Sequence, residues 1–291
     1  MRSALRAGWV CLLYFCFAGL AGCASSCGAQ RQVVAVDVFD DADASTLVDM
    51  ASAEVLAKEG ASRLPGFSVA LGATSGERWQ LSVRFRLATE RREADGKVRR
   101  ALGASATLVR LGDGEGPEQL SAEAMEADSF EAGASAAPLL ETLMTELSRR
   151  LATSARLSGA DPKALEAAIG SDDEHARAVA IAMVADRKMP ALRPKLEGLL
   201  TSGDIGPREA MRVAGALVKL GQPSSGAALI EAISRWPELT VPLIFSLSRL
   251  GGSEAAGYLF TVSSGHEVPQ VREAAAEALR ELERKAQGAH P

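Results

Sequence analysis

The sequence predicts an α+β domain followed by an all-α helical solenoid. Between residues 33 and 124, apolar and polar residues alternate in several short segments, as they do in strands with one buried face. After residue 161 the alternation stops, and an apolar pattern recurs at nearly constant intervals, which is typical of stacked helix pairs. Aromatic residues make up only 4% of the chain, which favours packing of helices on helices over a large sheet.

The first domain is expected to begin with a strand, a helix and a second strand. Val34, Val36 and Val38 lie two residues apart and would share one face of the first strand. Ser45 is a candidate N-cap for a helix that buries Val55 among other apolar residues. Pro65-Gly66 ends this unit, and the second strand should follow it directly.

Three more strands and a helix are expected to complete the domain. The clearest strand signal is the alternation of residues 81–87, which residues 102–108 repeat on the returning strand and residues 120–124 repeat once more. Pro138 opens a helix with leucines three and four residues apart. We therefore expect an α+β sandwich over residues 33–155, with an antiparallel sheet and two helices on one face.

The second domain, over residues 160–285, is defined by a repeat. Val184, Leu217, Leu247 and Leu279 occupy equivalent places in four similar segments, at spacings of 33, 30 and 32 residues. Second helices are expected around residues 192–200, 227–233 and 255–262. On this reading, the last repeat lacks its second helix. A plain helical bundle is the alternative interpretation.

Two resemblances to known families support these folds. Residues 271–275, Val-Arg-Glu-Ala-Ala, resemble the short bacterial HEAT repeat, which implies a surface for protein recognition. The chain departs from that pattern at Pro242, inside a helix, and at Arg187, where a leucine is expected. In the first domain, residues 33–39, 45–60 and 65–67 resemble small domains of envelope-associated bacterial proteins, such as the N-terminal domain of TolB-like proteins.

The N-terminus is similar to the precursor segment of bacterial lipoproteins. Arg2 and Arg6 precede an apolar run over residues 9–17, and Leu20-Ala21-Gly22-Cys23 matches the lipobox. This resemblance implies a signal peptide over residues 1–22, acylation of Cys23 with fatty acids such as palmitate, and a linker over residues 23–32. Ala24 implies the outer membrane, with the protein facing the periplasm. A plain signal peptide and a short membrane anchor are the alternatives.

Composition excludes several classes of function. The net charge of −5 becomes −7 without residues 1–22, which carry two arginines and no acid, so nucleic acid is not an expected partner. Once the signal peptide is removed, Cys27 is the only cysteine besides Cys23, and it is interpreted as part of the linker. The sequence contains no HExxH, no cysteine pair and no G-x-S-x-G, so we expect no catalytic residue, metal, cofactor or small-molecule substrate. His175 follows the acidic residues 172–174, which we interpret as the start of a helix with Ser171 as its cap.

One basic cluster stands out in this acidic chain. Arg84, Arg86, Arg99 and Arg100 fall on one predicted hairpin, interleaved with acidic residues. A solvated hairpin that neutralises its own charge is one interpretation. The other is a contact for an anionic partner, either lipid headgroups or an acidic protein.

These features together predict a membrane-anchored, non-enzymatic lipoprotein that acts as a protein-interaction scaffold or adaptor. The membrane contact would be the lipidated Cys23, and the protein partner would bind the helical solenoid. The alternative is an accessory lipoprotein of a cell-envelope machine for secretion, transport or motility, acting through the α+β domain. Some HEAT-like proteins resemble bilin lyases, but no other feature of the chain points to pigment chemistry.

Overall fold

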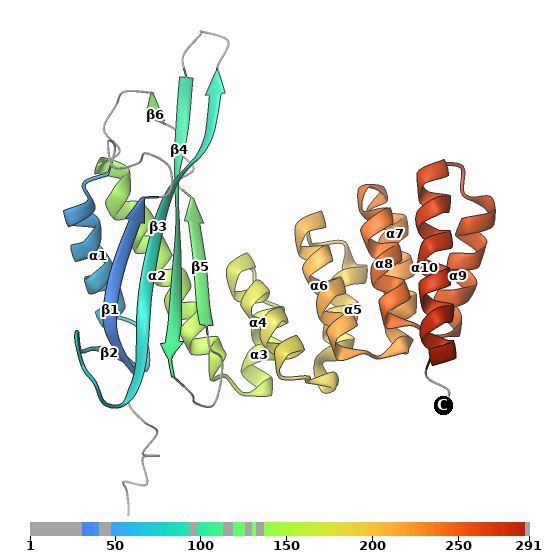
Figure 1. Ribbon diagram of the computed structural model, residues 1–291, viewed down its shortest axis with the longest axis horizontal. Coiled ribbons are helices and arrows are strands. Elements are labelled where there is room, and N and C mark those ends of the chain that lie inside the picture. The colour runs from blue at the N-terminus through green and yellow to red at the C-terminus, as the bar shows by residue number, and fades with distance from the viewer. Residues whose placement is uncertain are drawn as a thin grey trace, which may run out of the picture.

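The computed structural model describes residues 31–40, 48–92, 98–112, 119–125, 130–131 and 137–288. Within these residues a mixed β-sheet with two helices comes first, and eight further helices follow it (Figure 1). The order of elements in the first region is β1 (Arg31–Asp40), α1 (Met50–Ser62), β2 (Phe67–Val69), β3 (Glu77–Arg92), β4 (Val98–Leu111), β5 (Gln119–Met125), β6 (Phe130–Glu131) and α2 (Ala137–Ser158).

The sheet is mixed, which corrects the expectation of an antiparallel sheet. Its strand order is β2-β1-β3-β4-β5, with β6 pairing to β4. β3, β4 and β5 are antiparallel to one another, but β1 is parallel to both β2 and β3. Helix α1 carries the chain back to the start of β1, so β2 runs in the same direction as β1. The turn after β2 returns the chain to the start of β1 once more, so β3 also begins there and runs parallel to β1.

Both helices of this region pack on one face of the sheet, where the buried cluster lies. The predicted alternation of β3, β4 and β5 matches the observed burial, and Phe85 is fully buried at the centre. In β1 the expected face is wrong at one position. A bulge between Val33 and Ala35 shifts the register, so Val33 is buried there in place of Val34.

Helix α1 buries a different face from the one expected. Asp49 caps it by accepting a hydrogen bond from the Ala51 amide, whereas Ser45 lies outside the described residues. Val55 is 56% exposed, and the buried residues are small: Ala53, Ala57, Gly60 and Ala61. Gly60 packs so tightly against Ser148 of α2 that a Cβ there would clash with the serine hydroxyl. The small residues therefore allow the two helices to approach each other closely.

The second region contains α3 (Pro162–Ile169), α4 (Glu174–Asp186), α5 (Arg193–Ser202), α6 (Pro207–Leu220), α7 (Gly226–Arg235), α8 (Thr240–Leu250), α9 (Ser253–Gly265) and α10 (Pro269–Gly288). Short 3₁₀ turns that begin at a proline precede α5, α7 and α8. Pro242 lies in the first turn of α8, where a missing amide proton breaks no helical hydrogen bond.

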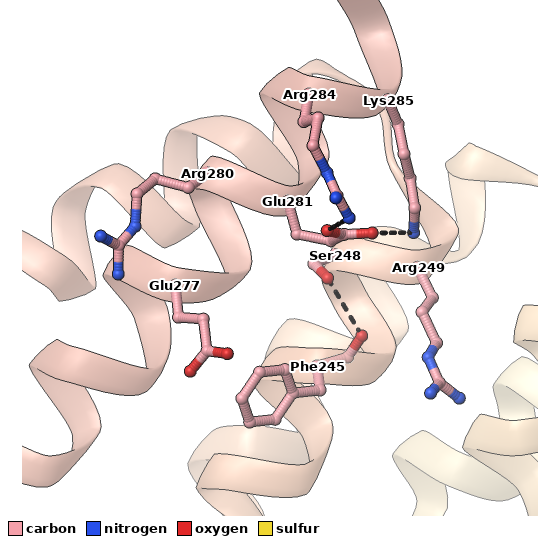
Figure 2. Close-up of a pocket in the computed structure, with 8 residues that line it drawn as sticks. All are labelled: Phe245, Ser248, Arg249, Glu277, Arg280, Glu281, Arg284 and Lys285. Carbon is pink, nitrogen blue, oxygen red and sulfur yellow. Dashed lines mark hydrogen bonds and ion pairs between the residues drawn. The ribbon is translucent and has the colours of Figure 1, made fainter. Parts of the chain in front are cut away.

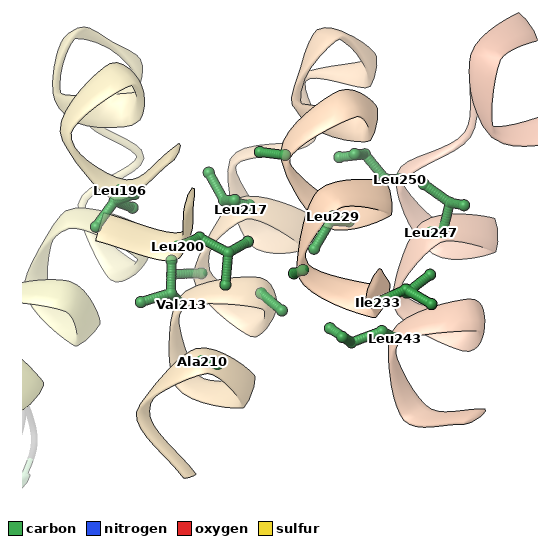
Figure 3. Packing of buried hydrophobic residues seen from close by; sticks show 14 of the residues in the cluster. Leu196, Leu200, Ala210, Val213, Leu217, Leu229, Ile233, Leu243, Leu247 and Leu250 are labelled. Atoms are coloured by element: carbon green, nitrogen blue, oxygen red, sulfur yellow. The ribbon is translucent and has the colours of Figure 1, made fainter. Parts of the chain in front are cut away.

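These helices form two layers. α4, α6, α8 and α10 pack side by side in one layer that begins at α2, and α3, α5, α7 and α9 form the other. Each odd-numbered helix packs on the even-numbered helix that follows it, so the pairing starts one helix earlier than expected, and α10 is the partner of α9. Figure 3 shows the leucines and other apolar residues that fill the space between the layers.

Candidate functional site

The start of β1 is the described segment nearest to the predicted lipidation site. Cys23 itself lies outside the described residues. Arg31 places its guanidinium 5.5 Å from the ring centre of Phe67 and 6.0 Å from that of Trp79, and it pairs with Glu77 at 3.6 Å. These contacts hold the end of the predicted linker against the sheet. None of the described helices has the length and apolar character needed to cross a membrane.

Arg84 and Arg86 lie on the face of the sheet opposite the two helices, as expected. Both side chains are exposed, but neither is isolated. The Arg84 guanidinium lies 4.6 Å from the ring centre of Phe39, and that of Arg86 lies 3.8 Å from a carboxylate oxygen of Glu123. Arg86 is therefore partly neutralised within the sheet, and Arg84 forms an exposed pair with an aromatic ring.

Arg99 and Arg100 belong to a different part of the hairpin. The β3–β4 hairpin extends past the ends of β1 and β5 (Figure 1), and the backbone positions of Arg99 and Arg100 lie in this extension, where they pair with β6. The partner of Arg86 on β4 is Gly103. Arg100 and Arg99 are three and four residues farther along, about 10–14 Å away. The fold thus brings Arg84 and Arg86 together but does not gather all four arginines at one point.

The junction between the two regions depends on Arg187, which the sequence pattern marks as a departure from the repeat. Its guanidinium donates to the carbonyls of Leu157, Ser158 and Ala160, at and just beyond the end of α2. Carbonyls at a helix end have no partner within the helix. An arginine suits this position because its neighbour is the end of α2, which offers carbonyls.

His175 makes a second link at the junction, and it joins three elements. Its Nε2 lies 2.9 Å from the Arg150 carbonyl and 3.1 Å from the Ser154 hydroxyl, and that hydroxyl donates to the Ser121 carbonyl on β5. Nε2 must carry a proton to donate to the Arg150 carbonyl, so the proton of a neutral imidazole lies on this atom. Burial lowers the pKa of His175, which favours the same neutral form.

Ion pairs surround this histidine. Arg149 bonds both Glu146 on its own helix, at 2.7 Å, and Asp173 at the start of α4, at 3.0 Å. The hydrogen bond from Arg149 lowers the pKa of Glu146 to about 2. The cap of α4 is Asp173, which accepts from the amides of His175 and Ala176, and not Ser171 as expected. The acidic residues before His175 therefore start the helix and bind Arg149, in agreement with a structural interpretation of this cluster.

Two arginines make the same contact in different helices of the second region. Arg177 in α4 donates to the carbonyl of Ser171, six residues before it, and Arg272 in α10 donates to that of His266, also six residues before it. Arg177 continues to Glu209 on α6 with two hydrogen bonds of 2.8 and 2.9 Å. In the sequence, both arginines could be identified only as part of the HEAT-like pattern, and these contacts could not be predicted from it.

No group of three or more histidine, cysteine, aspartate or glutamate side chains among the described residues is arranged to hold a metal ion. The features that remain as candidates for function are surfaces: the exposed sheet face with Arg84 and the outer face of the helical layers. Comparison with family models, curated proteins and solved structures gave no match for this chain.

Proposed function

We propose that this chain is a membrane-anchored, non-enzymatic lipoprotein that binds protein partners through HEAT-like repeats. The observation that carries the proposal is the long, two-layered helical region, in which every helix from α4 to α8 has a neighbour on each side in its own layer. Arrays of this kind expose a continuous surface larger than one helix pair could offer, and their usual role is protein recognition.

The contacts between successive helices support the repeat interpretation. Arg177 and Arg272 occupy equivalent positions, since each lies seven residues before Val184 or Leu279 in the repeat register, and each bonds the carbonyl six residues before it. Asp186 and Lys219 are also 33 residues apart and form an ion pair between neighbouring helices. Equivalent positions that make equivalent contacts are expected of a repeat and not of an irregular bundle.

The predicted anchor would hold the protein close to a membrane, and Ala24 favours the outer membrane with the protein facing the periplasm. Cys23 lies eight residues before Arg31, so a fully extended linker would reach about 28 Å. Acyl chains on Cys23 would each contribute about 0.8 kcal/mol for every buried CH₂ group, which makes a multiply acylated anchor stable. Replacing Cys23 by serine should abolish incorporation of radiolabelled palmitate and release the protein from the membrane fraction.

Photo-crosslinking on the full-length chain tests the scaffold proposal. Phe260 on α9 is 64% exposed and can be replaced by a photoreactive phenylalanine without disturbing the core. We expect this position to capture a defined envelope protein in living cells. Phe39, on the exposed sheet face, provides the matched control position. Capture from Phe39 in place of Phe260 would contradict the proposal.

The exposed sheet face supports a second candidate, an accessory lipoprotein of an envelope machine that acts through its α+β region. The observation in its favour is the exposed pair of Arg84 and Phe39, next to Arg86. Reversing Arg84, Arg99 and Arg100 to glutamate should then weaken partner association in a salt-dependent manner. Unchanged association with both partner and anionic vesicles would leave this candidate without support.

A further inference from the structure

A hollow of about 450 Å³ lies between α8 and α10, near the end of the helical region. We call it the α8–α10 groove, and the residues that line it are Phe245, Ser248, Arg249, Glu277, Arg280, Glu281, Arg284 and Lys285. Four of these eight side chains are basic and two are acidic, so the lining has an excess of positive charge although the whole chain has a net charge of −5.

The repeat register explains why the groove is open. Asp186, Lys219, Arg249 and Glu281 follow one another at 33, 30 and 32 residues, the spacings of the repeat itself. In the first interval the opposite charges meet, because Lys219 Nζ lies 2.8 Å from an Asp186 carboxylate oxygen. The last interval again offers opposite charges, Arg249 and Glu281, at the equivalent positions.

This second pair does not form. Glu281 binds Arg284 and Lys285 on its own helix, and its pKa is lowered by the hydrogen bond from Arg284. Figure 2 shows these two contacts as dashed lines, whereas none leaves Arg249 or Arg280. Within the described part of the chain, Arg249 makes no hydrogen bond or ion pair, and Arg280 bonds only the carbonyl of Ala276 on its own helix.

Helix α8 contributes no acid to the groove. Arg249 is the only charged residue of α8, and the neighbouring α6 carries three basic residues, Arg208, Arg212 and Lys219, of which Lys219 is paired with Asp186. The single acid of α6, Glu209, is bound to Arg177. Guanidinium groups without a carboxylate partner, beside the ring of Phe245, form a surface suited to carboxylate and apolar side chains together.

We propose that the α8–α10 groove binds an acidic peptide segment of a protein partner, with a partner carboxylate on Arg249 in the place that Glu281 leaves vacant. The proposal rests on the scaffold function above and names its binding site. A protein is favoured over lipid headgroups because the groove lies at the opposite end of the molecule from β1, where the predicted anchor begins (Figure 1).

Binding of a defined probe tests the proposal. The probe is a short fluorescein-labelled peptide of alternating glutamate and leucine, and the protein is full-length and solubilised in detergent. Fluorescence anisotropy should show salt-dependent binding that is lost when each glutamate of the probe is glutamine. Arg249→Glu and Arg280→Glu should each weaken binding roughly tenfold, because a charge-assisted bond becomes a repulsion.

Two further variants make the result specific to the groove. Glu281→Gln removes the carboxylate that occupies Arg284 and Lys285, so probe binding should become roughly threefold tighter. Arg63→Glu, at the residue that follows α1, is the matched control, since this side chain is 78% exposed and distant in sequence from α8 and α10, and it should change nothing. Circular dichroism of each variant should equal that of the parent, because the substituted side chains lie at the surface.

Three outcomes would overturn the proposal. The first is equal binding of the glutamine peptide, and the second is unchanged binding in both arginine variants. The third is binding of inorganic phosphate or of anionic phosphatidylglycerol vesicles at this site without binding of the peptide, which would make the groove a general anion or lipid site. If the groove fails but crosslinking at Phe260 still captures a partner, the scaffold function stands without this site.

Discussion

The sheet region and the helical region bury their apolar residues in different ways. In the sheet region, β1 pairs with strands that are distant from it in sequence: it pairs with β3, and its Asp37 accepts a hydrogen bond from Gln80, 43 residues away. In the helical region each helix packs on helices that are close to it in sequence, and this arrangement continues along the chain. A sheet of this kind is stable only as a whole, whereas a row of helices that contact only near neighbours is expected to gain stability step by step. We therefore expect a core substitution in the sheet region to destabilise the whole sheet, and one in the helical region to destabilise only the neighbouring helices.

The largest expected effect comes from removing a large side chain from the core of the sheet region. Phe85 is fully buried there, and Phe85→Ala should lower the free energy of unfolding by about 4 kcal/mol. Hydrogen exchange should then accelerate throughout β1, β3 and β4, because their pairing depends on one core, while the amides of α6 to α9 stay protected.

Leu229→Ala is the matched substitution in the helical region. Leu229 is also fully buried, and its loss should cost about 3 kcal/mol. The faster exchange should be confined to the helices that surround α7. Equal acceleration in both regions for either variant would show that the two regions unfold as one unit and would remove the contrast.

The next effect concerns the ion pair inside the helical region. The side chains of Arg177 and Glu209 are only 16% and 4% exposed, and two hydrogen bonds join them. Glu209→Gln leaves the arginine without its counter-charge, so the unfolding free energy should fall by about 3 kcal/mol. The double variant Arg177→Met, Glu209→Leu should recover most of this loss in urea unfolding. A double variant as unstable as the single one would mean that the pair itself, and not the orphaned charge, provides the stability.

The same difference between the regions explains what the sequence could predict. Strands β3, β4 and β5 follow from alternation, and α4 to α10 follow from the recurring apolar positions, because each pattern states which face of an element is buried. Periodicity does not state which strands pair or in which direction, so the parallel placement of β1 could not be derived. The bulge at Val34 and the burial of small residues on α1 are decided by packing against distant segments, which the local pattern does not contain.

The candidate sites were less predictable than the fold. Arg84 and Arg86 were correctly placed on one exposed face because a strand alternates its side chains. Arg187 was recognised only as a break in the repeat, since its carbonyl partners belong to another region of the chain. The α8–α10 groove exists because Glu281 pairs with Arg284 and Lys285 on its own helix and not with Arg249 on α8. The spacing of these residues in the sequence does not determine which partner Glu281 binds.

A pH dependence should appear where the two regions meet. Burial lowers the pKa of His175 in the folded protein, so the unfolded chain takes up a proton first as the pH falls through about 6.5. Stability is therefore full above this pH and decreases below it. In His175→Gln, the melting temperature should fall less between pH 7 and pH 5 than in the parent. The loss due to Glu146, whose pKa is about 2, begins only below its ordinary value near 4.5, so the two groups can be separated. Identical pH profiles would show that the junction does not depend on the neutral histidine.

The smallest effect is expected at the exposed ion pair between α4 and α6. Lys219 and Asp186 lie 2.8 Å apart, but their side chains are 65% and 51% exposed. Solvent screens such a pair, so Lys219→Ala should change the unfolding free energy by less than about 0.5 kcal/mol. The buried pair of Arg177 and Glu209, which joins the same two helices, should show a much larger effect. Urea unfolding at low and high salt measures both the contribution of this ion pair to the unfolding free energy and its screening by salt. A change as large as that of Glu209→Gln would show that charge at this repeat position stabilises the helix row. The open arrangement of Arg249 and Glu281 would then carry a cost in stability, which a bound acidic partner would offset.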